Sequence, residues 1–187
     1  MRKAKEIKLA IRKQYMWGST SGLKCFMNRI FHSESYNTYR FLLHLRKYEY
    51  LLTQRSSPIT IISRRWNLMK YQKYARKCGF VIGDGVLGTD VIFYHNANII
   101  INPKAKVGAG CKFHGNCCIG VAHTDDEKAP ILGQNVDIGY GAVILGDVYI
   151  ADNITIGANS VVTKSFHTPG ITIAGVPAKE IKRSVSQ

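Results

Sequence analysis

Residues 129–165 read APILGQNVDIGYGAVILGDVYIADNITIGANSVVTKS, and an aliphatic residue returns at every sixth position of this stretch. The series consists of Leu132, Ile138, Ile144, Ile150, Ile156 and Val162. A period of six fits neither an α-helix nor an alternating strand, whose periods are about 3.6 and 2 residues. It is typical of a chain wound into triangular coils, with one short strand on each face and a turn at each corner.

The period also predicts which side chains stack. Three hexads make one coil, so residues eighteen positions apart should lie above one another, and each coil should cover the apolar layer of the coil before it. The expected pairs are Leu132 with Ile150, Ile138 with Ile156, and Ile144 with Val162. Glycine, asparagine and aspartate near the corners tolerate unusual backbone angles.

A matching series precedes an interruption in the pattern. Counting back in sixes from Ile119 gives Phe113, Val107, Ile101 and then His95. The step from Ile119 forward to Leu132 is thirteen, so the phase slips within GVAHTDDEKAP (120–130), a polar stretch that reads as a loop. By this count His95 occupies an apolar position one coil below Phe113, where an imidazole costs stability unless its nitrogens are paired.

The hexads, followed by IAGVPAKEI (173–181), resemble the hexapeptide-repeat acyltransferases. Within that superfamily, YHNANIIINPKAKVG (94–108), followed by a loop and then API, resembles the serine acetyltransferase branch, closest to members found in capsule and exopolysaccharide clusters. The resemblance covers residues 79–183. It implies a mainly β fold, a left-handed parallel β-helix, over residues 79–187, assembled as a homotrimer with active sites between neighbouring prisms.

The resemblance also implies an activity. These enzymes transfer an acetyl group directly from acetyl-CoA to a hydroxyl, with a histidine as general base and no metal in the chemistry. His95 matches the position of that histidine. An imidazole can take the proton of an alcohol as it attacks the thioester, then return it to the leaving thiolate. A hydrogen-bonded structural histidine is the alternative for His95.

Three departures from serine acetyltransferases concern the acceptor. Those enzymes have Asp immediately before the histidine, where this chain has Tyr94, and a second histidine before the proline that follows the loop, where it has Ala129. An acidic residue expected further upstream falls near Phe80. The groups that would hold free serine are thus absent, which favours a sugar or polysaccharide-precursor hydroxyl; serine O-acetylation and an inactive β-helix scaffold remain as alternatives.

Two other histidines are candidates. His123, in the loop, could supply the missing second imidazole, with Asp125 or Asp126 orienting one of the histidines; a solvated loop is the alternative. His114 lies one position past an apolar residue and should point outward, either lining the groove between subunits or forming part of the surface.

For acetyl-CoA, the resemblance carries over five positions. Small residues would let pantetheine lie against the coil, and lysines would meet the nucleotide phosphates. These positions are Gly120, Tyr140, Ala158, Lys164 and Lys179. Tyr140 departs from the small residue usual there, and the two lysines could equally be solvated surface charges.

The first part of the chain differs in texture and charge. Residues 1–78 hold 18 Lys or Arg against three acids, whereas residues 79–187 hold eight against nine. Helical spacing of apolar and basic residues predicts an α-helical basic region over 1–78, with a last helix from about Ile62 to Cys78 after the break at SSP (56–58). With Trp17, Phe26 and Phe31, this region could lie on an anionic membrane face, bind a lipid-linked glycan, or form a solvated helical cap.

Composition bounds the remaining possibilities. The chain has 187 residues, 45% of them hydrophobic, and its charged N-terminus has no apolar signal core, which indicates a cytoplasmic protein, peripheral at the inner membrane face if the basic region binds lipid. Its five cysteines have no zinc-type spacing and read as reduced packing residues. His95, His114 and His123 lack the spacing of a γ-type carbonic anhydrase, and no nucleic-acid motif accompanies the basic charge.

Overall fold

The computed structural model describes residues 34–181, which form parts of two compact units that divide between Phe80 and Val81. The described part of the first unit, from residue 34, contains two helices, α3 (Glu34–Leu52) and α4 (Pro58–Cys78). The second is built from short strands. The segments 6–18 and 23–31, for which the sequence also indicates helices, lie outside the described residues. Within residues 34–181, no helix combines the length and the hydropathy needed to cross a bilayer.

Helix α4 begins earlier than the sequence analysis expects. Ser57 is its N-cap: the Ser57 hydroxyl accepts the Thr60 N–H at 3.2 Å, and the Thr60 hydroxyl accepts the Ser57 N–H at 2.6 Å. Pro58 then occupies the first turn, where a missing N–H costs nothing. The Ser-Ser-Pro sequence is therefore the start of the helix as well as the end of the preceding connection. The helix ends at Gly79, in the left-handed conformation with φ 74°.

His44 is a structural residue of the helical unit. It is buried, its Nδ1 donates to Asn67 Oδ1 at 2.9 Å, and its Nε2 accepts from the Arg40 guanidinium at 3.0 Å. Its ring stacks on Tyr74 with the centroids 6.0 Å apart. Burial lowers the pKa of His44 from 6.5 to about 4, and the nearby positive charges act in the same direction, so the ring is neutral at physiological pH.

The neutral state of His44 makes the helical unit acid-sensitive. Because the unfolded chain binds a proton on His44 at higher pH than the folded chain, the free energy of unfolding should fall as the pH drops from 6.5 towards about 4. The loss should reach about 3 kcal/mol, measured by denaturant unfolding followed through the helical circular dichroism signal. His44→Gln should flatten this dependence, whereas His167→Gln, at an exposed position, should keep it. An unchanged slope in His44→Gln would contradict the assignment.

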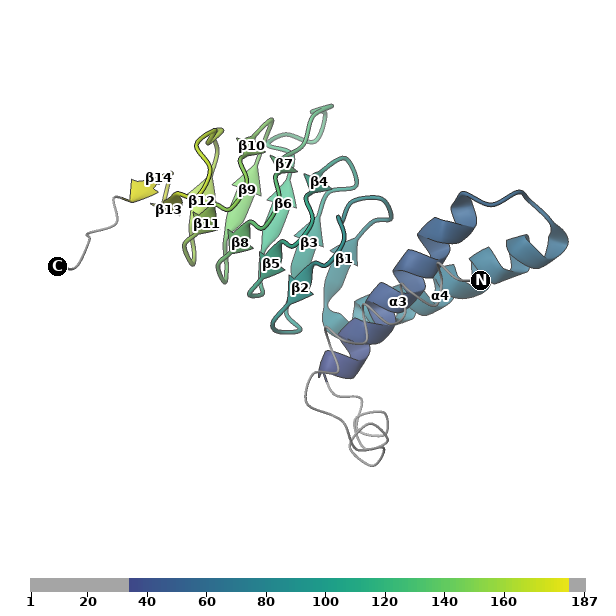
Figure 1. Cartoon of the computed structure of the whole chain (residues 1–187). Coiled ribbons are helices and arrows are strands. Elements are labelled where there is room, and N and C mark those ends of the chain that lie inside the picture. The colour runs from purple at the N-terminus through teal and green to yellow at the C-terminus, as the bar shows by residue number, and fades with distance from the viewer. Residues whose placement is uncertain (1–33, 182–187) are drawn as a thin grey trace. The chain divides into compact units, whose positions relative to one another are not determined.

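The second unit is a β-helix with three sheets, and Figure 1 shows its strands stacked coil upon coil. Sheet A contains β1 (Phe80–Ile82), β3 (Ile99–Ile101), β6 (Cys118–Gly120), β9 (Val143–Leu145) and β12 (Val161–Val162). Sheet B contains β4 (Lys106–Val107), β7 (Ile131–Leu132) and β10 (Tyr149–Ile150). Sheet C contains β2 (Ile92–Phe93), β5 (Lys112–Phe113), β8 (Asp137–Ile138), β11 (Thr155–Ile156), β13 (Thr172–Gly175) and β14 (Ala178–Ile181). The registered pairs between successive coils are parallel, and β14 pairs antiparallel with β13.

The predicted stacking of the hexads is confirmed. Leu132 pairs with Ile150, Ile138 with Ile156, and Ile144 with Val162, and all six side chains are at most 2% exposed. The predicted interruption is confirmed as well. Val107 pairs with Leu132, 25 positions away rather than eighteen, because the irregular segment 121–130 adds seven residues at one corner of the coil.

The structure corrects the position of His95. Phe93, not His95, lies one coil below Phe113: the two are paired in register, both are buried, and their ring centroids are 5.1 Å apart. His95 is exposed in the turn between β2 and β3. Ile100 pairs with Cys118, eighteen positions on, but Ile92 pairs with Lys112, twenty positions on. This turn therefore holds two residues more than the next one, and a step of six back from Ile101 stops at His95, two residues short of the true apolar position at Phe93.

Candidate active site

One edge of the β-helix gathers candidate residues from four coils. The turns that lead from sheet C to sheet A are 94–98, 114–117, 139–142 and 157–160, and we call them together the His95 edge. Gly141 N–H donates to Gly115 O at 3.0 Å, and Asn159 N–H donates to Tyr140 O at 2.8 Å. A Cβ on Gly115 would lie 3.1 Å from Ala97 Cβ and 3.3 Å from Tyr140 Cε2. His95, His114, Tyr140 and Ala158 are thus successive members of one edge.

The side chain of His95 is exposed in the first of these turns, 94–98. Tyr94, just before it, is the last residue in the ladder of sheet C, and its N–H donates to Phe113 O at 2.9 Å. Because the imidazole of His95 is at the surface, it does not carry the loss of stability that the sequence analysis expected for a buried histidine. A surface imidazole held by a short turn against a rigid sheet is accessible to a bound alcohol, as a general base must be.

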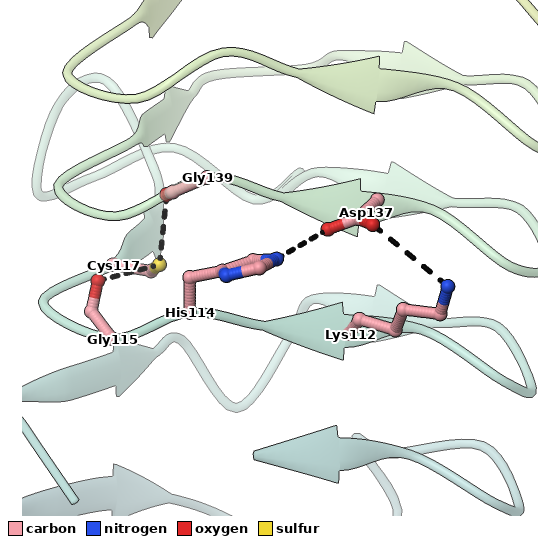
Figure 2. A network of polar contacts seen from close by, with 6 residues as sticks. All are labelled: Lys112, His114, Gly115, Cys117, Asp137 and Gly139. Atoms are coloured by element: carbon pink, nitrogen blue, oxygen red, sulfur yellow. Dashed lines mark hydrogen bonds and ion pairs between the residues drawn. The ribbon is translucent and has the colours of Figure 1, made fainter. Parts of the chain in front are cut away.

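His114 belongs to a polar network beside this turn (Figure 2). Its Nε2 donates to Asp137 Oδ1 at 2.8 Å, and Lys112 Nζ lies 3.8 Å from Asp137 Oδ2. The network crosses from β5 to β8, where Lys112 and Asp137 are paired in register. The Tyr94 ring stacks on His114, with centroids 4.6 Å apart and planes inclined by 30°. By holding His114, the network also supports the ring of Tyr94, the residue that precedes His95.

Sequence reasoning proposed His114 but missed Asp137. His114, just after β5, and Asp137, in β8, lie on adjacent coils, yet they are 23 positions apart in the sequence, whereas the hexad pattern predicts coils of eighteen residues. The pairing emerges only when the seven extra residues of the loop are included in the register. The sequence did contain this information: the step from Ile119 to Leu132 is thirteen residues, which is one hexad plus the seven extra residues of the loop.

The loop carrying His123 lies at another corner. It leaves the end of β6 in sheet A, so within one chain it belongs to the edge between sheets A and B. Asp126 Oδ2 accepts the backbone N–H of His123 at 2.8 Å, and Asp126 N–H donates to His123 O at 3.1 Å. Asp126 thus fixes the backbone of the loop, whereas the sequence analysis offered it as a partner for an imidazole.

The five positions proposed for acetyl-CoA fall in three places. Tyr140 and Ala158 are exposed on the His95 edge. Gly120, at the end of β6, and Lys164, after β12, lie on the edge between sheets A and B; Gly120 O accepts Gly146 N–H at 3.0 Å, and Lys164 Nζ lies 5.4 Å from the Phe166 ring centroid. Lys179 is exposed in the β13–β14 hairpin, opposite Ala174.

The described cysteines are placed for packing. Cys78, Cys111, Cys117 and Cys118 are free thiols, and all but Cys118 are buried. Cys117 Sγ donates to Gly115 O at 3.1 Å and Gly139 O at 3.5 Å, as Figure 2 shows. Burial raises the pKa of all four, to about 11 for Cys111 and about 12 for Cys78. Among the residues that the structure describes, no group of three His, Cys, Asp or Glu side chains could hold a metal ion.

These raised pKa values predict slow alkylation of the native thiols. Well below both values, a thiol with a pKa of about 11, as at Cys111, has about a hundredfold less thiolate than one at 9.0. Peptide mapping by mass spectrometry after a short iodoacetamide pulse should find Cys78, Cys111 and Cys117 unlabelled and Cys118 labelled most among the four described thiols. Labelling in denaturant supplies the control, because all four should then react alike. Rapid native labelling of Cys117 would contradict the packing role.

Comparisons with known proteins point to one family. No family model matches the chain. It is 30% identical over 159 residues to the serine acetyltransferase of Buchnera aphidicola, covering 82% of this chain and 54% of that protein. It is 34% identical over 100 residues to the serine acetyltransferase of Mycobacterium tuberculosis, covering 53% of this chain and 43% of that protein. The chain thus spans about half the length of these relatives.

Solved structures agree on the fold. The soybean serine acetyltransferase apoenzyme has a TM-score of 0.72 at 20% identity, over 97% of this chain and 70% of that one. The Brucella abortus serine acetyltransferase in complex with coenzyme A has a TM-score of 0.67 at 20% identity, over 96% and 68%. The predicted left-handed parallel β-helix is therefore confirmed. The comparisons support the serine acetyltransferase-like hexapeptide-repeat family, but not its narrower capsule and exopolysaccharide branch.

Proposed function

We propose that this chain is an acetyl-CoA-dependent O-acyltransferase, and that L-serine is the first acceptor to test. The observation that carries the proposal is the exposed imidazole of His95, in a β-helix turn at the position that matches the catalytic histidine of the family. The similarity to a serine acetyltransferase over 82% of the chain supports the same reading. It also favours serine over the sugar acceptor that the sequence analysis preferred.

The proposed chemistry is a direct transfer. The acceptor hydroxyl attacks the thioester carbonyl carbon while His95 takes its proton, which gives a tetrahedral oxyanion. The carbon–sulfur bond then breaks, and the imidazolium returns the proton to the CoA thiolate. The described thiols take no part, since burial keeps them protonated.

Acetyl-CoA would use the positions carried over from the family. On the His95 edge, Tyr140 and Ala158 would face the pantetheine arm, and Gly120 would leave room for it along the edge between sheets A and B. The exposed Lys164 and Lys179 would meet nucleotide phosphates.

The family match likewise supports a cytoplasmic homotrimer with sites between neighbouring prisms, in which His123 of the loop would approach a neighbour's site.

Loss of His95 should abolish most of the activity. His95→Ala should lower acceptor-dependent release of CoA thiol from acetyl-CoA by about 10²–10⁴-fold, the usual contribution of a general base. The matched control is His167→Ala, because His167 is also exposed but stacks on Tyr149 away from the His95 edge. Serine, sugars, nucleotide sugars and lipid-linked glycans should all be tried as acceptors.

The outcomes of that assay separate the candidates. Turnover that survives His95→Ala would move the base elsewhere, to His114 or His123. If the wild type shows no turnover with any acceptor and binds no CoA in equilibrium dialysis, the chain is an inactive scaffold and the proposed function is wrong.

A sugar hydroxyl is the second candidate acceptor, and Tyr94 favours it. This residue replaces the family's Asp, is about half exposed, and presents an aromatic ring whose other side rests on His114. An aromatic face suits the apolar face of a sugar ring better than a free amino acid. Ala129, in place of the family's second histidine, is buried and offers serine no polar group.

Tyr94 variants distinguish the two acceptors. With a sugar acceptor, Tyr94→Ala should lower kcat/KM about three- to tenfold through KM, and Tyr94→Phe should retain the wild-type value because the ring remains. With serine as the acceptor, Tyr94→Asp should raise kcat/KM by restoring a carboxylate beside His95. A sugar KM unchanged in Tyr94→Ala would remove the support for the second candidate.

A further inference from the structure

Helix α4 exposes a continuous apolar stripe. Ile59, Ile62, Trp66 and Met69 follow one another at helical spacing, so they share one side of the helix. Their exposed fractions are 77%, 68%, 53% and 56%. The residues that α4 buries, Asn67, Tyr71, Tyr74, Ala75 and Cys78, lie on its other side. Four large apolar side chains exposed in one line are more than the scattered apolar residues of an ordinary surface.

The same helix is strongly cationic. Its 21 residues include six Lys or Arg and no Asp or Glu. Arg65 and Lys70 flank the stripe, and Lys70 Nζ lies 4.5 Å from the centroid of the Trp66 ring. Lys73, Arg76 and Lys77 are exposed in the last two turns. The surface therefore combines an apolar line with positive charge that no acid within α4 offsets.

Charge argues against self-contact as the cover of this stripe. Arg64 is turned inward and donates to Leu51 O at 2.9 Å, so five of the six cations remain on the outer side of α4. Two copies meeting through this side would bring ten cations together without an acid from either helix. Residues 1–33 of the same chain are a poor cover for the same reason, because their eight Lys or Arg against one acid, Glu6, would be repelled by the cations of α4. The complementary partner is anionic, and it must also accept four apolar side chains. A nucleic acid offers the charge but no apolar phase, whereas an anionic bilayer offers both.

We infer that the outer face of α4 is a docking surface for an anionic phospholipid membrane. Ile59, Ile62 and Met69 enter the boundary between headgroups and acyl chains, with Trp66 at the interface. Lys and Arg side chains reach the headgroup phosphates along their flexible stems. The helix lies in the plane of the surface. This surface consists of described residues, and differs from Trp17, Phe26 and Phe31, which lie outside them.

Vesicle binding tests the inference without using catalytic activity. The full chain should co-sediment with vesicles of phosphatidylcholine mixed with phosphatidylglycerol, and not with phosphatidylcholine alone, and added salt should release it. Ile62→Ser should weaken the partition coefficient about tenfold, and Lys73→Glu at least fivefold. In a Trp17→Phe background, leaving Trp66 as the one tryptophan, emission should shift to the blue when anionic vesicles are added.

Matched controls come from the β-helix. Ile131→Ser changes an isoleucine that is 48% exposed, and Lys106→Glu an exposed lysine, and neither should alter binding. Circular dichroism verifies that each variant is folded. The inference is overturned if anionic vesicles do not bind the protein, or if Lys73→Glu and Ile62→Ser bind them as the wild type does. It is also overturned if Ile62→Ser abolishes a concentration-dependent self-association of a protein that ignores vesicles, because the stripe would then be a contact between copies.

Discussion

Each coil of the β-helix must place its aliphatic side chains directly over those of the coil below. Ile138, fully buried between Phe113 and Ile156 in adjacent strands, is one such position. Burial of each layer depends on this register, because a slip of one residue would turn the apolar side chain outward. The strands therefore cannot absorb extra residues. Additions are accommodated at the corners, in the turn 94–98 and the segment 121–130, and those corners carry His95 and His123.

This constraint explains what the sequence could predict. The stacked pairs from Leu132 to Val162 follow from the period alone, because every corner between them has the same length. The position of His95 does not, because His95 lies within the turn 94–98, which holds two residues more than the corresponding turn of the next coil. The His114–Asp137 pair was missed for a related reason: it joins two coils on either side of the loop. At Pro58 the error was chemical, because a proline read as a break also suits the first turn of a helix.

Polar residues have different roles in the two units. In the β-helix the candidate site residues lie at the surface, and the buried apolar layers fix the backbone that carries them. A substitution at such a position, such as Tyr94 in place of Asp, therefore changes the site without disturbing the fold. In the helical unit the polar residues are divided: His44 and Asn67 form a hydrogen bond in the interior, and Arg65, Lys73, Arg76 and Lys77 of α4 are exposed. Chemistry and surface recognition can therefore vary separately along one chain.

The hairpin at the C-terminal end has a consequence for solubility. A stack of parallel coils ends in open strand edges, onto which a coil of another molecule could add and begin a fibre. Strand β14 turns back on β13 and runs antiparallel to every strand below it in sheet C. It also places the charged and exposed Lys179 and Glu180 at the rim. In sheet C, the reversed direction and the charged rim therefore disfavour the addition of a parallel strand from another molecule.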